Sequence, residues 1–433
     1  MNRLSRRRLL GLAAGGAAAA GGTAGGFVLG RESGTLAARA AVTYPFLGAH
    51  QAGITTPAQG RMHVAAFDLT TDSVDDLVAL LRRWTVMAAR LTQGESAGRY
   101  APASGPYDAP PEDTGEAMGL SPSGLTLTVG FGRSIFVPGS DGSDRFGLAD
   151  RLPAALVTLP HFPQDALEPA RCDGDLVVQA CADDPQVAVH AIRNLSRIAF
   201  GTATIRWSQL GYGRTSSTSR TQQTPRNLFG FKDGTANVMA EDSDLLSEHV
   251  WVQDGDTDTG GGDSTWMTGG SYLVARRIRM LIETWDRTSL REQEAIVGRT
   301  KGDGAPLSGG TEFSEPDFAL AGRGGVPLIA PDSHLRLAHP SSHGGAMMLR
   351  RGYNYTDGSD ELGRLDAGLF FVAFVRDPRT HYIPVQNTLS RDDVMMEYLR
   401  HTGSGLFAVP AGVPEGSRLD ADSGAFVGEA LFA

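Results

Sequence analysis

The alternation of apolar and polar residues predicts a first series of strands and helices in the N-terminal half of the chain. One helix is expected after Ser73, whose hydroxyl can cap it, and Asp76 three residues later resembles a capping box. A second helix is expected at Asp184, because Pro185 follows it and proline is favoured in a first turn. The strands of this series are expected at residues 63–69, 125–129, 175–180 and 202–207.

A second series with the same order is predicted in the C-terminal half. Its helices are expected at about residues 282–297 and at 391–401. Its strands are expected at residues 271–280, 346–349, 369–375 and 406–409. Two copies of the order strand–helix–strand–strand–helix–strand predict an α+β protein built from two ferredoxin-like sandwiches. We expect the first sandwich over residues 44–215 and the second over residues 216–433.

The first 40 residues have the composition of an export signal. Arg6 and Arg7 form an arginine pair, an uncharged Leu/Ala/Gly run covers residues 9–30, and residues 38–40 read Ala-Arg-Ala, a candidate cleavage site. The arginine pair indicates the twin-arginine route and its export machinery. The alternative is a membrane anchor, but the many glycines make the run a poor spanning helix. We therefore expect a periplasmic, cell-surface or extracellular protein.

Composition excludes some classes of function. The chain has 433 residues, a hydrophobic content of 41% and a net charge of −10. This charge argues against nucleic acid as a partner, because the phosphate backbone would be repelled. Cys172 and Cys181 are the only cysteines, and no disulfide is expected, because the extended run between them keeps the sulfurs apart. The chain has neither a CxxCH motif for covalent haem nor a cysteine cluster for zinc or iron–sulfur.

Two loops interrupt the pattern of strands and helices. Residues 93–123 are rich in Pro, Gly and Ser and are expected on the surface. Residues 254–270 begin with Asp254, Asp256 and Asp258 at alternate positions, which imitates a calcium loop. Thr265 stands where such a loop needs its twelfth-position glutamate, so a solvated acidic loop is favoured over a calcium site.

The segment NLFGFKDGTAN at residues 227–237 carries the strongest chemical signal. It brackets one carboxylate, Asp233, with Gly230 and Gly234, which let the main chain approach a flat ligand closely. Together with PDSHLRLAHP at residues 331–340 and MMLRRGY at residues 347–353, this segment resembles the dye-decolourising peroxidases, a haem-dependent family. The resemblance covers nearly the whole chain after the export signal. It implies that the two sandwiches form a barrel-like arrangement within one chain.

On one side of the haem, the resemblance implies that His334 is the axial iron ligand of one non-covalent haem b per chain. A neutral imidazole is the usual ligand in peroxidases, and its second N–H is usually given to an acceptor. Asp377 is the implied acceptor. His339 is implied to reach a haem edge or propionate, and His343 is a further histidine of the same segment.

On the opposite side, the resemblance implies that Asp233 is the acid–base catalyst and Arg350 the cation that stabilises a peroxide anion. Arg351 is the alternative, as one arginine of the pair could bind a propionate. Gly352 stands where some members have an asparagine. Because an unperturbed aspartate titrates near pH 4, activity is expected to be greatest in mild acid. The residues implied to lie against the haem here are Gly234, Thr235 and Ala236.

The resemblance implies a haem peroxidase that reduces hydrogen peroxide and oxidises dyes, phenols or other one-electron donors. A homo-oligomer is a further candidate assembly. One alternative keeps the cofactor but releases iron from haem, as a deferrochelatase does. A second alternative is a ligand-binding sandwich without catalytic activity. A third, chlorite dismutase-like activity, does not favour the GFKDGT loop. The signatures HExxH and Walker A are missing from the sequence.

Overall fold

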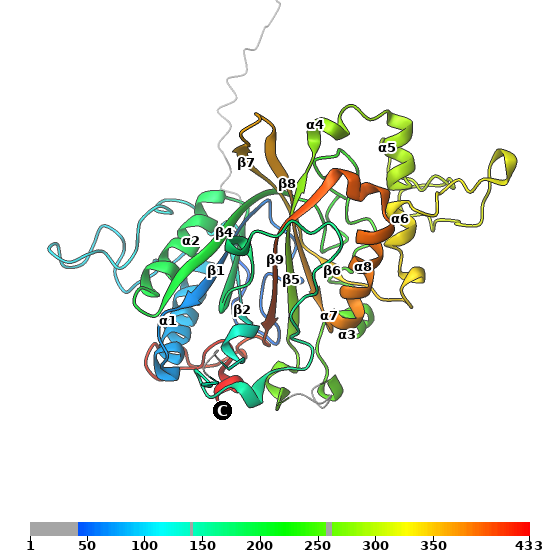
Figure 1. Ribbon diagram of the computed structural model, residues 1–433. Helices are drawn as coiled ribbons and strands as arrows, with labels where there is room; N and C mark the ends of the chain where they lie inside the picture. The colour runs from blue at the N-terminus through cyan, green and yellow to red at the C-terminus, as the bar shows by residue number, and fades with distance from the viewer. Residues whose placement is uncertain (1–41, 139–141, 257–261) are drawn as a thin grey trace, which may run out of the picture. The chain divides into compact units, whose positions relative to one another are not determined.

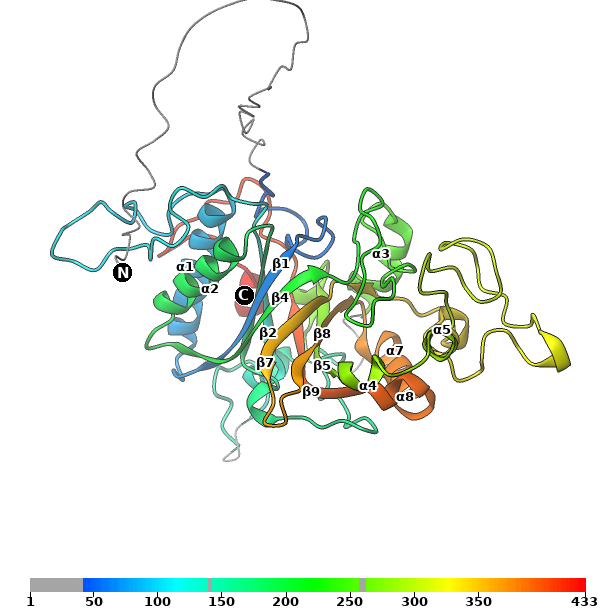
Figure 2. The ribbon, with the colours of Figure 1, turned by 90° about the horizontal axis from the view of Figure 1, so that it is seen from above.

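One antiparallel sheet organises the part of the chain that the computed structural model describes, residues 42–138, 142–256 and 262–433. Its strands follow in the order β5-β9-β2-β3-β1-β4-β7-β8-β6, and β5 also pairs with β8. The sheet therefore closes on itself in a barrel-like arrangement of an α+β fold (Figures 1 and 2). The predicted export signal lies outside the described residues. The strands are β1 (Arg61–Leu69), β2 (Thr126–Gly132), β3 (Leu176–Ala182), β4 (Ala203–Arg214), β5 (Ser271–Met280), β6 (Leu349–Arg350), β7 (Tyr353–Ser359), β8 (Leu365–Val375) and β9 (Leu399–Val409).

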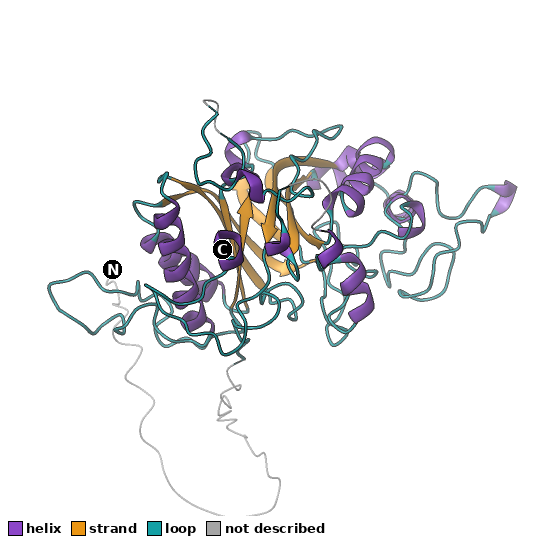
Figure 3. Ribbon diagram, turned by 90° about the horizontal axis from the view of Figure 1, so that it is seen from below, coloured by secondary structure: helices purple, strands orange, loops and turns teal. Residues whose placement is uncertain are grey.

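Two long helices cover the outer face of the sheet in the first half, α1 (Val74–Thr92) and α2 (Pro185–Ile198). Figure 3 shows helices on two sides of the strands. The predicted caps are present, because Ser73 accepts a hydrogen bond from the amide of Asp76 and Asp184 accepts one from that of Gln186. Trp84 is 1% exposed, and its indole N–H donates to the Leu195 carbonyl at 2.9 Å, which joins the two helices. This face is a filled hydrophobic core.

The helices of the second half are shorter. They are α3 (Ser243–His249), α4 (Ile282–Trp285), α5 (Leu290–Val297), α6 (His334–Leu337), α7 (Pro378–His381) and α8 (Ile383–Asp392). The helix predicted at 282–297 is broken into α4 and α5, because Ser289 caps a new helix by accepting from the amide of Glu292. None of the helices in the described residues is long and apolar enough to cross a bilayer.

The helix predicted at 391–401 is wrong. Residues 391–392 end α8, a 3-10 turn covers Val394–Tyr398, and β9 starts at Leu399. Asp393 caps the turn by accepting from the amide of Met395 at 2.8 Å. Pairing of β9 with β5 over residues 399–409 then overrides the helical periodicity. The strand β7 was not predicted.

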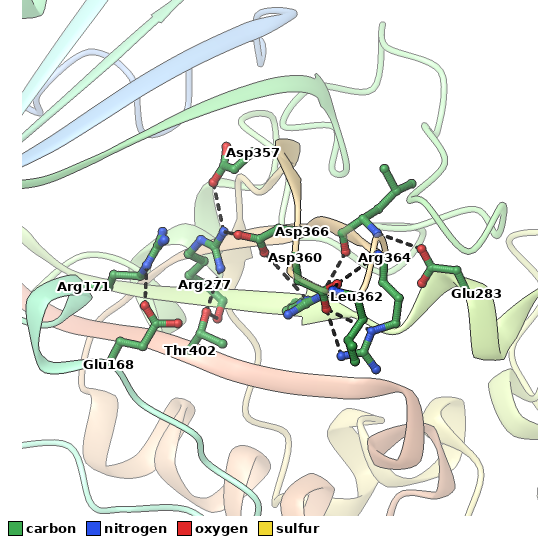
Figure 4. Close-up of polar contacts among 12 residues, drawn as sticks. Glu168, Arg171, Arg277, Glu283, Asp357, Asp360, Leu362, Arg364, Asp366 and Thr402 are labelled. Carbon is green, nitrogen blue, oxygen red and sulfur yellow. Dashed lines mark hydrogen bonds and ion pairs between the residues drawn. The ribbon is translucent and has the colours of Figure 1, made fainter.

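The interior of the barrel is filled by side chains from its strands, including Trp207, Tyr353 and Phe407. Arg277 of β5 is 3% exposed and donates to Thr402, Asp357 and Asp366 (Figure 4). It also donates to Gln209. Its charge is thus compensated inside the protein.

Two minor predictions concern the cysteines and the acidic loop. Cys172 and Cys181 are both buried and unpaired. In the acidic loop, Asp256 forms a bidentate ion pair with Arg376, so it serves the fold. Asp258 lies outside the described residues.

Candidate functional site

A cavity of about 430 Å³ lies on the outer face of the sheet in the second half. Its floor is formed by residues of β5, β8 and β9, and its walls by α6, α8, the 227–237 segment and residues 312–316. Residues 312–316 belong to a long segment, 299–332, that extends away from the sheet (Figure 1). Much of the wall is apolar, as a flat hydrophobic ligand requires. These apolar residues include Phe229, Phe231, Ile278, Met280, Leu335, Leu369, Phe371, Leu389 and Met396.

His334, the first residue of α6, lines one wall of this cavity. Its Nδ1 donates to Oδ2 of Asp393 at 2.7 Å, and the Asp393 side chain is 2% exposed. Because Nδ1 is engaged, Nε2 carries the lone pair that a metal can take. Burial disfavours the protonated form of His334, but the Asp393 carboxylate outweighs it, and the pKa of His334 is raised.

Asp377 was predicted to accept the hydrogen bond from His334, and this prediction is wrong. Asp377 caps α7 by accepting from the amide of Arg379 and pairs with the guanidinium of the same residue. Asp393 takes its place beside His334. The prediction of a helix at 391–401 concealed Asp393, and the only local signal was an acid standing before the apolar turn at 394–398.

Asp233 lies in a tight hairpin that forms another part of the cavity wall. The amide of Asn227 donates to the Phe231 carbonyl at 3.1 Å, and that of Asp233 to the Pro225 carbonyl at 3.0 Å. Gly234 has φ +80°, and a Cβ there would lie 2.8 Å from Cα of Ser216, so glycine is required.

The Asp233 carboxylate receives a donor at each oxygen. Arg350 Nη1 lies 3.1 Å from Oδ1, and Asn227 Nδ2 lies 3.1 Å from Oδ2. Arg350 is placed through its main chain, because Asn237 accepts from its amide at 2.7 Å and donates to its carbonyl at 2.9 Å. Asn227 and Asn237 were not predicted as site residues, although they stand at the two ends of the motif.

Arg351 leaves the strand on the other side. It is 0% exposed and donates to the carbonyl of Thr56 and to Gln59 in the first half of the chain. Arg350 is therefore the arginine of the cavity, as predicted from the motif. A Cβ on Gly352 would lie 2.8 Å from Oγ1 of Thr215, which leaves no room for the asparagine of some family members.

Polar side chains complete the wall beside Asp233. Lys232 forms an ion pair with Glu312, and Thr235 donates to the same carboxylate at 3.3 Å. Arg299 donates to the carbonyl of Glu312 at 2.8 Å, and burial lowers the pKa of Arg299. His339 pairs with Glu315 at 3.2 Å. The predicted site residues that line the one cavity are His334, Asp233, Arg350, Gly234, Thr235, Ala236 and His339.

Known proteins place this arrangement in a family. The family models described as "Dyp-type peroxidase, N-terminal" and "Dyp-type peroxidase, C-terminal" match residues 51–213 and 224–414. A deferrochelatase of Escherichia coli (strain K12) is 38% identical over 375 residues, which is 86% of this chain and 84% of the relative.

Solved structures agree. Ferric DtpA from Streptomyces lividans has a TM-score of 0.79 at 40% identity, covering 91% of this chain and 98% of DtpA. A DyP-type peroxidase from Cellulomonas bogoriensis has a TM-score of 0.75 at 38% identity, covering 90% of this chain and 98% of that protein.

The fold and the site thus define a haem-dependent peroxidase, an enzyme that acts on hydrogen peroxide and an electron donor. The chain belongs to the Dyp-type peroxidase family. The resemblance found in the sequence is confirmed, and the deferrochelatase alternative remains compatible with it.

Proposed function

We propose that the cavity holds one non-covalent haem b, with Nε2 of His334 facing the iron. The support is the fit of the residues: a largely apolar cavity of about 430 Å³, an imidazole with one free nitrogen, and a loop whose Gly234 keeps a side chain out of the wall. Arg299 adds the positive charge that a propionate needs. Bound haem supplies an iron centre that accepts peroxide and draws electrons from a donor.

The chain's own residues then divide the work. Asp393 holds Nδ1 of His334 and raises the basicity of the ligand. Asp233 accepts the proton from one oxygen of hydrogen peroxide and returns it to the other, so that the O–O bond breaks and water leaves. Arg350 stabilises the negative charge that develops on the peroxide.

The observation that carries this proposal is the pairing of Asp233 with Arg350 on one wall and of His334 with Asp393 on another wall of one cavity. Rapid mixing of the haem-loaded protein with peroxide tests it. Asp233→Ala and Arg350→Ala are expected to lower the second-order rate constant about 10²–10⁴-fold. Asp286→Ala and Arg287→Ala, exposed residues between α4 and α5, are the matched controls. Undiminished rates in both site variants would refute the assignment.

A second function, release of iron from haem, is supported by the relatives named deferrochelatase. Incubating the protein with haem and a reductant, without peroxide, distinguishes the two. Iron release leaves an intact metal-free porphyrin, which fluoresces, whereas peroxidase activity alone leaves the haem iron in place.

The two halves of the fold are proposed to be ferredoxin-like sandwiches, near the predicted ranges 44–215 and 216–433. The strand order β2-β3-β1-β4 of the first half and β7-β8-β5-β9 of the second support this reading. Export by the twin-arginine route is proposed from the sequence of residues 1–40 alone. Fractionation of cells that express Arg6→Lys/Arg7→Lys protein tests it, since the variant should stay inside the cytoplasm.

A further inference from the structure

The two asparagines at the ends of the 227–237 motif contact the two catalytic residues. Asn237 holds the main chain of Arg350, and Asn227 contacts the reacting carboxylate itself. Only Asn227 of these two asparagines contacts the side chain proposed to transfer the proton.

The orientation of the Asn227 amide is fixed by its second contact. Its Oδ1 accepts a hydrogen bond from the amide of Phe229 at 3.0 Å, so its NH₂ group must face Oδ2 of Asp233. An amide nitrogen donates and does not accept. The contact therefore stabilises a carboxylate oxygen that carries no proton.

We propose that Asn227 is a positioning residue that keeps Asp233 in its proton-accepting form and fixes the rotamer of its carboxylate. With Arg350 on Oδ1 and Asn227 on Oδ2, rotation of the carboxylate would break both contacts. The inference rests on the proposed function of Asp233 as the base.

Other charged groups also lie near Asp233, and their ion pairs do not involve Asn227. Lys232 is paired with Glu312, and His334 is paired with Asp393. A change in the titration of Asp233 after substitution of Asn227 is thus assigned to the amide. The charged groups of the cavity that face this region are Lys232, Arg299, Glu312, His334 and Arg350.

The first test follows the Asp233 carboxylate in the haem-free protein by ¹³C NMR, with its resonance assigned by its loss in Asp233→Asn. Asn227→Ala is expected to raise the titration midpoint of Asp233 above that of the wild type, because one hydrogen bond to the charged carboxylate is lost. Asn227→Asp keeps the size and the acceptor for Phe229 and adds a negative charge, so a larger upward shift than in Asn227→Ala is expected.

The second test measures the rate constant for peroxide against pH in the haem-loaded protein. The acidic limb of the profile is expected to move to higher pH in the same order, Asn227→Asp more than Asn227→Ala, while the rate at high pH is retained. Asn387→Asp is the charge control, because Asn387 is exposed on α8. If Asn227→Ala fails to fold, Asn227→Asp carries both tests.

An unmoved midpoint and an unmoved limb would overturn the inference, as would an equal fall in rate at every pH, which indicates a structural role only. If Asp233→Ala reacts at the wild-type rate, the proposed function fails. The NMR titration still decides the role of Asn227 in that case.

Discussion

The two halves of the barrel share a strand order but differ in how helices cover the outer face. In the first half, α1 and α2 have 19 and 14 residues, and they bury Leu77 and Trp84 to 1% exposure or less. In the second half, α6 has 4 residues and α8 has 10, and both line a cavity of about 430 Å³. The comparison shows that interrupted helices leave a ligand site where continuous helices leave a core.

The largest difference between the two halves is expected on replacement of Trp84 in the packed core of the first half. Its replacement by alanine removes a fully buried side chain and the hydrogen bond that joins α1 to α2, so a loss of about 3–5 kcal/mol in the free energy of unfolding is expected. Denaturant unfolding of the haem-free protein measures it. The Soret spectrum of the folded, haem-loaded variant should match that of the wild type. An altered spectrum would show that packing in the first half affects the haem cavity of the second half.

Acid is expected to destabilise both halves through one buried histidine in each. Burial lowers the pKa of His63 in β1 to about 4, and burial together with the charge of Arg276 lowers that of His401 in β9 to about 3. The unfolded chain binds these protons near pH 6.5. Stability present above pH 6.5 is therefore lost as the pH falls toward 4 for His63 and toward 3 for His401.

At pH 4.5 each histidine is expected to cost up to about 2.7 kcal/mol, two pH units of displaced titration. Unfolding free energies of wild type, His63→Gln and His401→Gln at pH 7 and pH 4.5 measure each share. Equal losses between these pH values in variants and wild type would exclude the two histidines as the cause.

Two aspartates of the second half sharpen the comparison further. Asp393→Asn keeps the shape but removes the charge beside His334, so haem affinity is expected to fall about 10–100-fold. Asp377→Asn, whose side chain contacts Arg379, is expected to leave haem affinity within about twofold. Titration of the haem-free proteins with haem measures both, and the reverse ranking would restore Asp377 as the partner of His334.

The smallest expected effects come from matched helix caps, one in each half. Ser73→Ala on α1 and Ser289→Ala on α5 each remove a side-chain cap and should cost about 1 kcal/mol of stability. Only Ser289→Ala should also weaken haem binding, because Val297 of α5 lines the cavity. Equal haem affinities in the two variants would show that α5 does not contribute to haem binding.

The sequence predicted the first half well because local signals and burial agree there. Ser73 and Asp184 cap the helices they were expected to cap, and the strands carry apolar residues that face a core. In the second half, β9 pairs with β5 across more than a hundred residues, and this non-local pairing overrides the helical pattern around residue 399.

The residues of the site show the same difference between local signals, which the sequence reveals, and non-local contacts, which it does not. Asp233, His334 and Arg350 stand in specific motifs, and the structure brings them to one cavity. Asp393 was missed because its contact with His334 spans 59 positions and depends on where α8 ends. The two hydrogen bonds between the Asn237 side chain and the main chain of Arg350 likewise join residues 113 positions apart, so they depend on where β6 lies in the sheet.

The opposite directions of Arg350 and Arg351 have a consequence for any attempt to separate the halves. A fragment starting at residue 216 would lack Ile54, Thr56 and Gln59, which accept most of the hydrogen bonds from the Arg351 guanidinium. The fixed positive charge of Arg351 would then be left without these partners in the protein interior, next to Arg350 of the cavity. We expect such a fragment to be insoluble when expressed alone and to be rescued by co-expression with residues 42–215.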